Sequence, residues 1–283
     1  MTGNGGLINL GEISKPATVL IERISDAVGG IAQPWQIKRV ARAEAEASLI
    51  QANARVQISE LEHRALIRMI REEGAKQENI EVITAQAVPQ VSDHATPENI
   101  ERDWLTQFFD RCRLISDEKM QSLWSSILAG EANAPGTFSK RTIELVATLD
   151  KRDAELFSKL CSYLWFFFGV PVPLIFDVTD SIYKNGGITF DALTHLDSLG
   201  LVRFDGVVGH QRNGVPKQIT CLYFDQPLVI EFSKNEQNTL LYGKTLLTQS
   251  GEELTKIVEA KALPEFKDYA TGKFKSFGYK ILS

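Results

Sequence analysis

Apolar residues recur at helical spacing throughout the N-terminal quarter of the chain. Between residues 18 and 31 they return every three or four positions, which predicts a short amphipathic helix. Residues 35–73 then contain neither glycine nor proline, are rich in Ala, Glu, Arg, Leu and Ile, and are followed by Gly74. At 1.5 Å per residue, this stretch predicts one long helix of about 57 Å that ends at the glycine.

The long predicted helix carries apolar residues on two of its sides. One stripe keeps a spacing of three and four residues that only Gln57 interrupts, and a second stripe runs beside it. A helix that is apolar on two sides must pack against other helices, from its own chain or from further copies. We therefore predict an interface with a second copy or a partner protein at the first stripe, which consists of Val40, Ala43, Ala47, Ile50, Ala54 and Leu61.

The pattern changes after this N-terminal region, residues 1–76. Residues 77–96 lack a sustained period, contain Pro89 and include acidic side chains but no Lys or Arg. These features are typical of a linker.

A series of helix-capping residues marks the next region. Thr96, Pro97 and Glu98 supply in order an N-cap, a proline for the first turn and an acid near the positive end of a helix. Ser116, Asp117 and Glu118 begin the next helix, Asp150 caps a further one, and this last helix is expected to run into the apolar residues 165–168. We therefore predict a central helical bundle over residues 97–176.

Residues 177–283 have a mixed helix and strand pattern. A predicted helix over residues 188–199 ends at Gly200, and strands over 201–208 and 218–224 follow, joined by a glycine-containing turn. This order is the outline of a winged helix. The expected fold class is mainly α: a long N-terminal helix, a central helical bundle and a C-terminal winged-helix-like α+β module.

Composition narrows the range of functions. Hydrophobic residues make up 43 % and charged residues 24 %, as in ordinary globular domains, and the net charge of −5 opposes extensive coating by nucleic acid. The three cysteines are far apart and form no CxxC motif, which favours buried thiols in a reducing compartment. The longest apolar run is too short to cross a membrane. We therefore expect a cytoplasmic protein.

No motif assigns a chemistry. The histidines and cysteines lack zinc-ligand spacing, and the glycine pairs do not fit a phosphate-binding loop. His195 follows Asp191 by four residues and precedes Ser198 by three, but such a helical pair is common on surfaces. We assign no catalytic, cofactor-binding or metal-ligating residue and expect no cofactor. The sequence favours a non-enzymatic role but does not decide whether the protein is an enzyme.

Besides binding to another protein, the sequence leaves two alternative functions open. The predicted recognition helix over residues 189–198 contains two aspartates and no basic residue, which opposes reading of the DNA major groove. Basic and aromatic residues alternate between 261 and 280, however, and could bind nucleic acid. The N-terminal helices could instead contact a membrane peripherally. The contact residues for these alternatives are Lys38, Arg39, Arg42, Lys273 and Lys275.

One region resembles a known family. Residues 115–141 read ISDEKMQSLWSSILAGEANAPGTFSKR, and residues 149–157 read LDKRDAELF. Together they resemble the signature of uncharacterised bacterial proteins defined by a domain of unknown function, and the likeness extends from about Trp35 onward. The LWxxILAGE segment also resembles the abortive-infection alpha family, which is tied to phage defence. Neither likeness brings catalytic residues. The two resemblances imply a helical bacterial protein that acts in anti-phage defence, and the self-association or partner binding expected of it comes from the apolar stripe of the long predicted helix.

Overall fold

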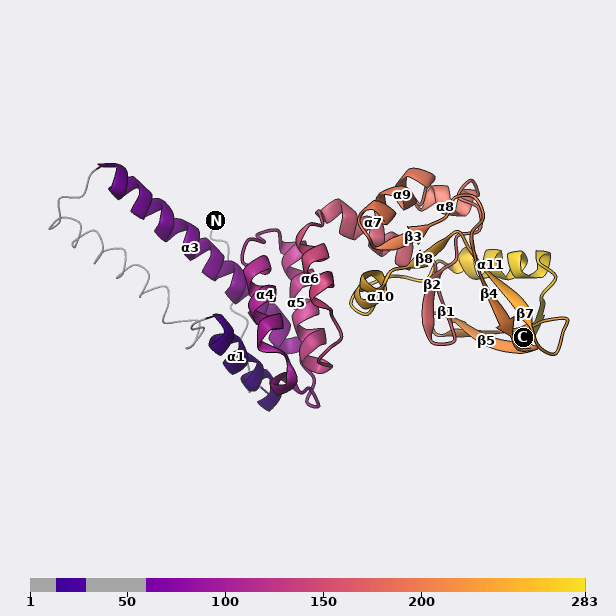
Figure 1. Cartoon of the computed structure of the whole chain (residues 1–283), viewed down its shortest axis with the longest axis horizontal. Coiled ribbons are helices and arrows are strands. Elements are labelled where there is room, and N and C mark those ends of the chain that lie inside the picture. The colour runs from indigo at the N-terminus through magenta and orange to yellow at the C-terminus, as the bar shows by residue number, and fades with distance from the viewer. Residues whose placement is uncertain (1–13, 29–59, 283) are drawn as a thin grey trace, which may run out of the picture. The chain divides into compact units, whose positions relative to one another are not determined.

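The computed structural model describes residues 14–28 and 60–282 and divides into two compact units, residues 1–140 and 141–283 (Figure 1). The described part of the first unit is built from helices. In chain order these are α1 (Lys15–Val28), α3 (Glu60–Ala87), the short 3-10 helices η1 (Val88–Gln90) and η2 (Pro97–Asn99), α4 (Arg102–Cys112) and α5 (Glu118–Asn133).

Helix α1 is amphipathic, and it packs with one face on its neighbours. Its buried residues Ala17, Leu20 and Ile24 follow each other at spacings of three and four, and the helix contacts η2 and α4. Aromatic stacking continues this core between α4 and α5. The rings of Trp104 and Phe108 stack at 5.1 Å, and Phe108 meets Trp124 edge-on at the same distance.

Helix α3 shows that the predicted boundary at Gly74 was wrong. The helix continues through Gly74 to Ala87, so residues 77–87 of the expected linker are helical. A glycine inside a helix costs only about 1 kcal/mol. Burial of Ile80 and Ile83, on a stretch that packs against α5, outweighs that cost. Residues 35–59 of the predicted long helix lie outside the described residues.

The loop that follows α5 contains part of the family-like signature and is organised around Glu131. One oxygen of this buried carboxylate accepts the N–H of Gly136 at 2.6 Å, and the other accepts the N–H of Phe138 at 2.9 Å. Trp104 Nε1 donates to the carbonyl oxygen of Phe138 at 2.7 Å. Gly136 has φ +88°, a conformation that favours glycine. These signature residues thus hold the shape of the loop.

The second unit combines helices with antiparallel strands. Its elements are α6 (Lys140–Ala147), which begins at the boundary, α7 (Lys151–Cys161), β1 (Leu164–Phe167), β2 (Val170–Pro173), α8 (Ser181–Asn185), α9 (Phe190–Ser198), β3 (Val202–Phe204), β4 (His210–Val215), β5 (Gln218–Tyr223), β6 (Gln226–Glu231), β7 (Asn238–Gly243), β8 (Thr245–Leu247), α10 (Gln249–Thr255), α11 (Pro264–Ser276) and β9 (Lys280–Leu282).

The strand pairing overturns the expected winged helix. One sheet has the order β2-β1-β5-β6-β9, while β3 pairs with β8 and β4 pairs with β7. The strands predicted to form the hairpin of the wing therefore belong to different sheets. The apolar residues 165–168, assigned to the end of a helical bundle, lie in β1 and the turn after it. The prediction of a mainly α fold with a bundle and a winged helix was wrong.

The neighbours of β5 in its sheet are β1 and β6, and its pairing with β6 is a local hairpin. The two-residue turn at Phe224 and Asp225 lets β6 pair with β5 along all six of its residues, from Gln226 to Glu231. Short turns close at low entropic cost, so this pairing competes well against pairing with β3, which residues 205–217 separate from β5. An alternating pattern identifies such strands, but it does not say which strand lies beside which.

One face of the five-stranded sheet is covered by α11. Phe274 of this helix meets Trp165 at 5.8 Å and Phe167 at 6.3 Å between ring centroids, in both cases edge-on. Phe266 of the same helix lies 5.6 Å from Tyr223. Aromatic side chains of β1, β5 and α11 therefore form the core of the second unit.

Candidate functional site

The N-terminal half of α3 is the most exposed apolar surface among the described helices of the first unit. All the buried residues of α3 lie in its last eight positions, between Ile80 and Ala87. In contrast, Leu61 is 68 % and Met69 55 % exposed, and Ala65 between them is exposed as well. Four-residue spacing places these three side chains on one face. We call this row, Leu61, Ala65 and Met69, the arm surface; it lies on the part of α3 that extends beyond α4 and α5 in Figure 1.

Only one of the predicted interface residues can be compared with the structure. Leu61 belongs to the arm surface and is exposed. The remaining predicted interface positions, and the basic residues proposed as an alternative contact, lie outside the described residues. These are Val40, Ala43, Ala47, Ile50 and Ala54, with Lys38, Arg39 and Arg42.

The charged residues of α3 pair with one another along the helix. Arg64 lies 3.0 Å from Glu60, Arg68 lies 3.7 Å from Glu72, and Lys76 lies 2.5 Å from Glu73. The hydrogen bond from Lys76 lowers the pKa of Glu73. Exposed pairs of this kind add little stability. They do compensate the charges of Arg64, Arg68 and Lys76, which leaves apolar contact as the main property of the arm surface.

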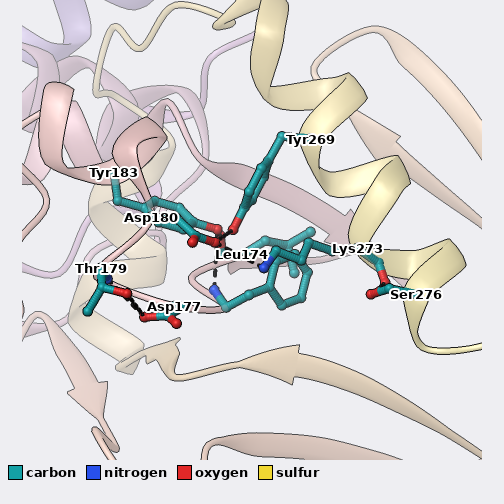
Figure 2. Close-up of polar contacts among 9 residues, drawn as sticks. Leu174, Asp177, Thr179, Asp180, Tyr183, Tyr269, Lys273 and Ser276 are labelled. Carbon is teal, nitrogen blue, oxygen red and sulfur yellow. Dashed lines mark hydrogen bonds and ion pairs between the residues drawn. The ribbon is translucent and has the colours of Figure 1, made fainter.

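A second cluster of polar side chains lies between α8 and α11 of the second unit (Figure 2). Tyr269 Oη donates to Asp180 Oδ2 at 2.5 Å, and Lys273 Nζ lies 3.0 Å from the same oxygen. Asp177 accepts hydrogen bonds from the backbone N–H and the hydroxyl of Thr179 at 2.9 and 2.8 Å. We call Asp177, Asp180, Tyr269 and Lys273 the Asp180 cluster.

The electrostatics of the Asp180 cluster do not suit acid–base catalysis near neutral pH. The hydrogen bond from Tyr269, followed by that from Lys273, lowers the pKa of Asp180. Burial, together with the hydrogen bond to that carboxylate, raises the pKa of Tyr269. The carboxylate is thus held ionised and the phenol neutral, whereas proton transfer favours groups that titrate near the working pH. The contacts instead fasten the start of α8 to α11.

Next to this cluster, Tyr183 ties the loop after β2 to α8. Its hydroxyl donates to the carbonyl oxygen of Leu174 at 2.7 Å and accepts the N–H of Phe176 at 3.2 Å. Burial raises the pKa of Tyr183. This neutral, buried phenol satisfies backbone groups that would otherwise lack partners.

The basic and aromatic residues near the C-terminus have different surroundings. Phe266 and Phe274 are fully buried, and Lys273 is engaged by Asp180. Lys275 is exposed. The aromatic faces of Phe266 and Phe274, which would be needed to stack on nucleic-acid bases, are therefore inside the second unit.

His195 pairs with a residue that sequence spacing did not indicate. Its Nε2 lies 2.7 Å from Oδ1 of Asp153 in α7, and Ser198 donates to the backbone carbonyl of His195 rather than to the ring. Burial alone would raise the pKa of Asp153, but the hydrogen bonds from His195 and from the N–H of Asp150 outweigh it and lower that pKa. The pair joins α7 to α9. Because 42 residues separate Asp153 from His195 in the sequence, helical spacing could not predict this pair.

Sites for metals and reactive thiols are absent from residues 14–28 and 60–282. No group of at least three His, Cys, Asp or Glu side chains could hold a metal ion there. Cys112, Cys161 and Cys221 are free and buried, and burial raises the pKa of Cys161 and of Cys221 to about 12. Thiols in such surroundings are poor nucleophiles. In the same part of the chain, every helix falls short of the length and apolar character needed to span a membrane.

Comparison with protein families identifies the chain. A family model described as "Protein of unknown function (DUF2806)" matches residues 63–271, which is most of the sequence. The chain belongs to this family. No curated protein and no solved structure matches it. The expected membership of a family defined by a domain of unknown function is confirmed.

The DUF2806 match begins within α3 and ends within α11. It therefore includes most of the described part of α3, the loop organised by Glu131, and three of the four residues of the Asp180 cluster, which are Asp177, Asp180 and Tyr269. Of the arm surface, Ala65 and Met69 fall inside the matched residues and Leu61 lies just before them.

Proposed function

We propose that this protein is a non-enzymatic protein that self-associates, or binds a partner protein, through its N-terminal arm. The observation that supports this proposal is the contrast along α3. The end that packs on α5 buries its apolar residues, whereas the other end exposes Leu61 and Met69. Large apolar side chains in a row on a projecting helix favour contact with another protein.

The test is the mass of the full-length protein in solution. Because the last residues of α3 contribute to the core, substitution is a cleaner test than removal of the helix. Leu61→Glu combined with Met69→Glu introduces two charges on the arm surface, which opposes burial in an interface. Leu114→Glu is the matched control, since Leu114 is 66 % exposed but lies after α4.

We expect the wild type and Leu114→Glu to elute as oligomers in chromatography with light scattering, and the double variant to shift toward the monomer. A monomeric wild type, or a double variant whose mass equals that of the wild type, would contradict self-association through the arm surface. A photo-reactive residue in place of Met69 then reports the partner in cells. Cross-linking to another protein rather than to a copy supports the partner-binding form of the proposal.

The proposed biological role is defence against phage of the abortive-infection type. It rests on the resemblance of the segment from Leu123 to Glu131 to the abortive-infection alpha family. Expression of the wild type should lower phage plating efficiency, and the double arm variant should lose this effect while Leu114→Glu keeps it. A phage plating efficiency that is the same with and without the protein, for every phage of a panel, would contradict a role in phage defence.

Binding of nucleic acid through Lys273 and Lys275 is the first alternative function. The burial of Phe266 and Phe274 and the pairing of Lys273 with Asp180 count against it. Affinity for single-stranded DNA that falls steeply with salt, and that Lys275→Glu weakens, would favour this alternative.

Peripheral contact with a membrane through the N-terminal helices is the second alternative. The apolar stripe of α1, Ala17, Leu20 and Ile24, is already buried within the first unit, which counts against insertion into lipid. Flotation of the protein with anionic liposomes would favour it.

A further inference from the structure

The five-stranded sheet has one face that points away from α11. Side chains alternate between the two faces of a strand, so Tyr223 of β5 faces α11 while its neighbour Leu222 is exposed on the other side. Strand pairing places Leu222 between Phe166 of β1 and Pro227 of β6. Phe166 in turn lies opposite Pro171 of β2. We call these four residues, Pro171, Phe166, Leu222 and Pro227, the sheet row; it crosses four neighbouring strands.

A further aromatic ring lies at the end of β1, in the turn to β2. Phe168 is 43 % exposed, and Arg212 of β4 lies over its ring, with 4.1 Å between the guanidinium carbon and the ring centroid. The backbone of Phe168 has φ +53°, a conformation that glycine or asparagine adopts at lower cost. An exposed ring at a strained position indicates that the ring has a function beyond packing.

The charges beside these rings are positive. Residues 163–173 and 206–224, which supply β1, β2, β4 and β5, contain no Asp or Glu and, apart from His210, two basic residues. These are Arg212 and Lys217, and both are exposed. Two acids follow in the same sheet: Asp225 in the turn before β6, and Glu231, which pairs with Lys280 of β9 at 3.0 Å. Positive charge beside exposed rings complements a chain of phosphates and planar bases.

The apolar area of this face is small. Phe166, Phe168 and Leu222 are 38 %, 43 % and 41 % exposed, and at roughly 200 Å² per side chain they offer roughly 250 Å². A stable protein interface buries about 800 Å² on each partner. A second copy or a folded protein partner is therefore a poor match, whereas a thin chain held by stacking and by charge suits this area.

Uncharged polar side chains lie beside the rings. Gln218 and Thr220 share the exposed face of β5 with Leu222, and Gln211 is exposed next to Arg212 on β4. Amides and hydroxyls can donate to or accept from the 2′-hydroxyl group that distinguishes RNA from DNA.

We propose that this face of the second unit binds a short single strand of RNA. Bases stack on Phe166 and Phe168, and Arg212 holds a phosphate. The face contains no residue of the arm surface, so this binding is independent of the proposed self-association.

The first test uses the full chain and a fluorescein-labelled oligouridylate of about ten nucleotides, within the usual range of site sizes. Fluorescence anisotropy at low ionic strength gives the affinity. We expect binding that weakens as salt is added, and weaker binding once the strand is annealed to oligoadenylate, because its bases are then already stacked. No binding of the single strand, or equal binding of the duplex, would overturn the proposal.

Two further probes check the kind of chain. Oligodeoxyuridylate lacks the 2′-hydroxyl groups and should bind more weakly, and oligoglutamate should compete poorly because it has no rings to stack. Equal binding of oligodeoxyuridylate would overturn the assignment to RNA. Equal competition by oligoglutamate would replace RNA with an acidic peptide.

Substitution of Phe166 tests stacking. Phe166→Thr keeps a residue that suits a strand but removes the ring, so it should weaken RNA binding by about fivefold or more. Phe190→Ala is the matched control, since Phe190 is 54 % exposed but lies on α9, and it should leave binding unchanged. Equal effects of the two variants, or no effect of Phe166→Thr, would contradict the site.

Substitution of Arg212 tests the phosphate contact. Arg212→Gln should make the dependence of log affinity on log salt concentration less steep by about 0.7, the value for one phosphate contact on a single strand. Lys275→Gln, at an exposed position of α11, should leave this slope unchanged. A slope that falls with Lys275→Gln but not with Arg212→Gln would place the nucleic acid on α11 and overturn the proposal.

Photo-crosslinking locates the strand without any substitution in the protein. An oligouridylate that contains 5-iodouracil attaches to aromatic side chains against which the base stacks, and mass spectrometry of the peptides identifies them. We expect adducts at Phe166 or Phe168. Adducts confined to other residues would overturn the proposal, even if the Phe166→Thr variant failed to fold.

Discussion

Helices α3 and α11 carry similar residues but use them in opposite ways. Both have basic residues beside large apolar ones, and both contain residues predicted to form contact surfaces. On α3 the charges pair within the helix while Leu61 and Met69 stay exposed. On α11 the aromatic residues Phe266 and Phe274 are buried, and Lys273 is engaged by a different element. Composition alone therefore does not show whether a helix offers a surface to a partner. The elements packed against the helix decide which of its side chains are already buried or paired.

The largest expected effect is on the buried side of α11. Phe274→Ala removes a ring that contacts Trp165 and Phe167, so the free energy of unfolding should fall by about 3–5 kcal/mol. Urea denaturation followed by tryptophan fluorescence measures this change. A loss below about 1 kcal/mol would mean that α11 does not cover the sheet as described.

The Asp180 cluster should give a smaller effect on the same helix. Tyr269→Phe removes the hydrogen bond to Asp180 but keeps the ring, so it should cost about 1 kcal/mol at pH 7, given that the cluster is partly exposed. Lys275→Met, at an exposed position of α11, is a control that should change stability little. Equal stabilities of Tyr269→Phe and the wild type would show that the cluster does not fasten α8 to α11.

The same contact predicts a pH dependence. Since the folded protein lowers the pKa of Asp180, its contribution is present above the carboxyl pKa of the unfolded chain, about 3.9, and is lost as pH falls through the lower folded value. The stability difference between the wild type and Tyr269→Phe should therefore be constant from about pH 7 to 5 and shrink below about pH 4. Denaturation curves across this range check it, and a difference that grows in acid would contradict it.

The smallest effects belong to the arm. Leu61→Ala and Arg68→Gln should each change the free energy of unfolding by less than about 0.5 kcal/mol, because the first side chain is exposed and the second forms an exposed pair within one helix. Denaturation at low protein concentration, where association is minimal, makes the measurement. A loss above about 2 kcal/mol for Leu61→Ala would show that the arm surface belongs to the folding core.

Local signals were predicted well from the sequence. Asp117 caps α5 by accepting from the N–H groups of Lys119 and Met120, and Asp150 begins α7 in a capping box with Asp153. These interactions join residues two or three positions apart, so the chain needs no distant partner to form them. The helix after Thr96 was only partly right, because Pro97 begins a 3-10 turn and α4 starts at Arg102.

Long-range contacts were not predictable in the same way. Asp180 and Tyr269 are 89 residues apart, and Thr142 meets Glu253 at 2.6 Å across 111 residues. No periodicity connects such positions. The strand partners of the supposed wing were missed for the same reason, since an alternating pattern assigns faces but leaves the neighbour open.

The sequence by itself determined the local rules of this chain: which residues begin helices, which stretches are apolar enough to be buried, and which family the chain belongs to. Tertiary structure alone decided that α3 continues through Gly74, that residues 164–167 form a strand, and that Lys273 is paired while Leu61 is exposed. The physical reason is the range of the interactions. Caps and helical periods act over a few residues, whereas packing and strand pairing depend on which distant side chains meet.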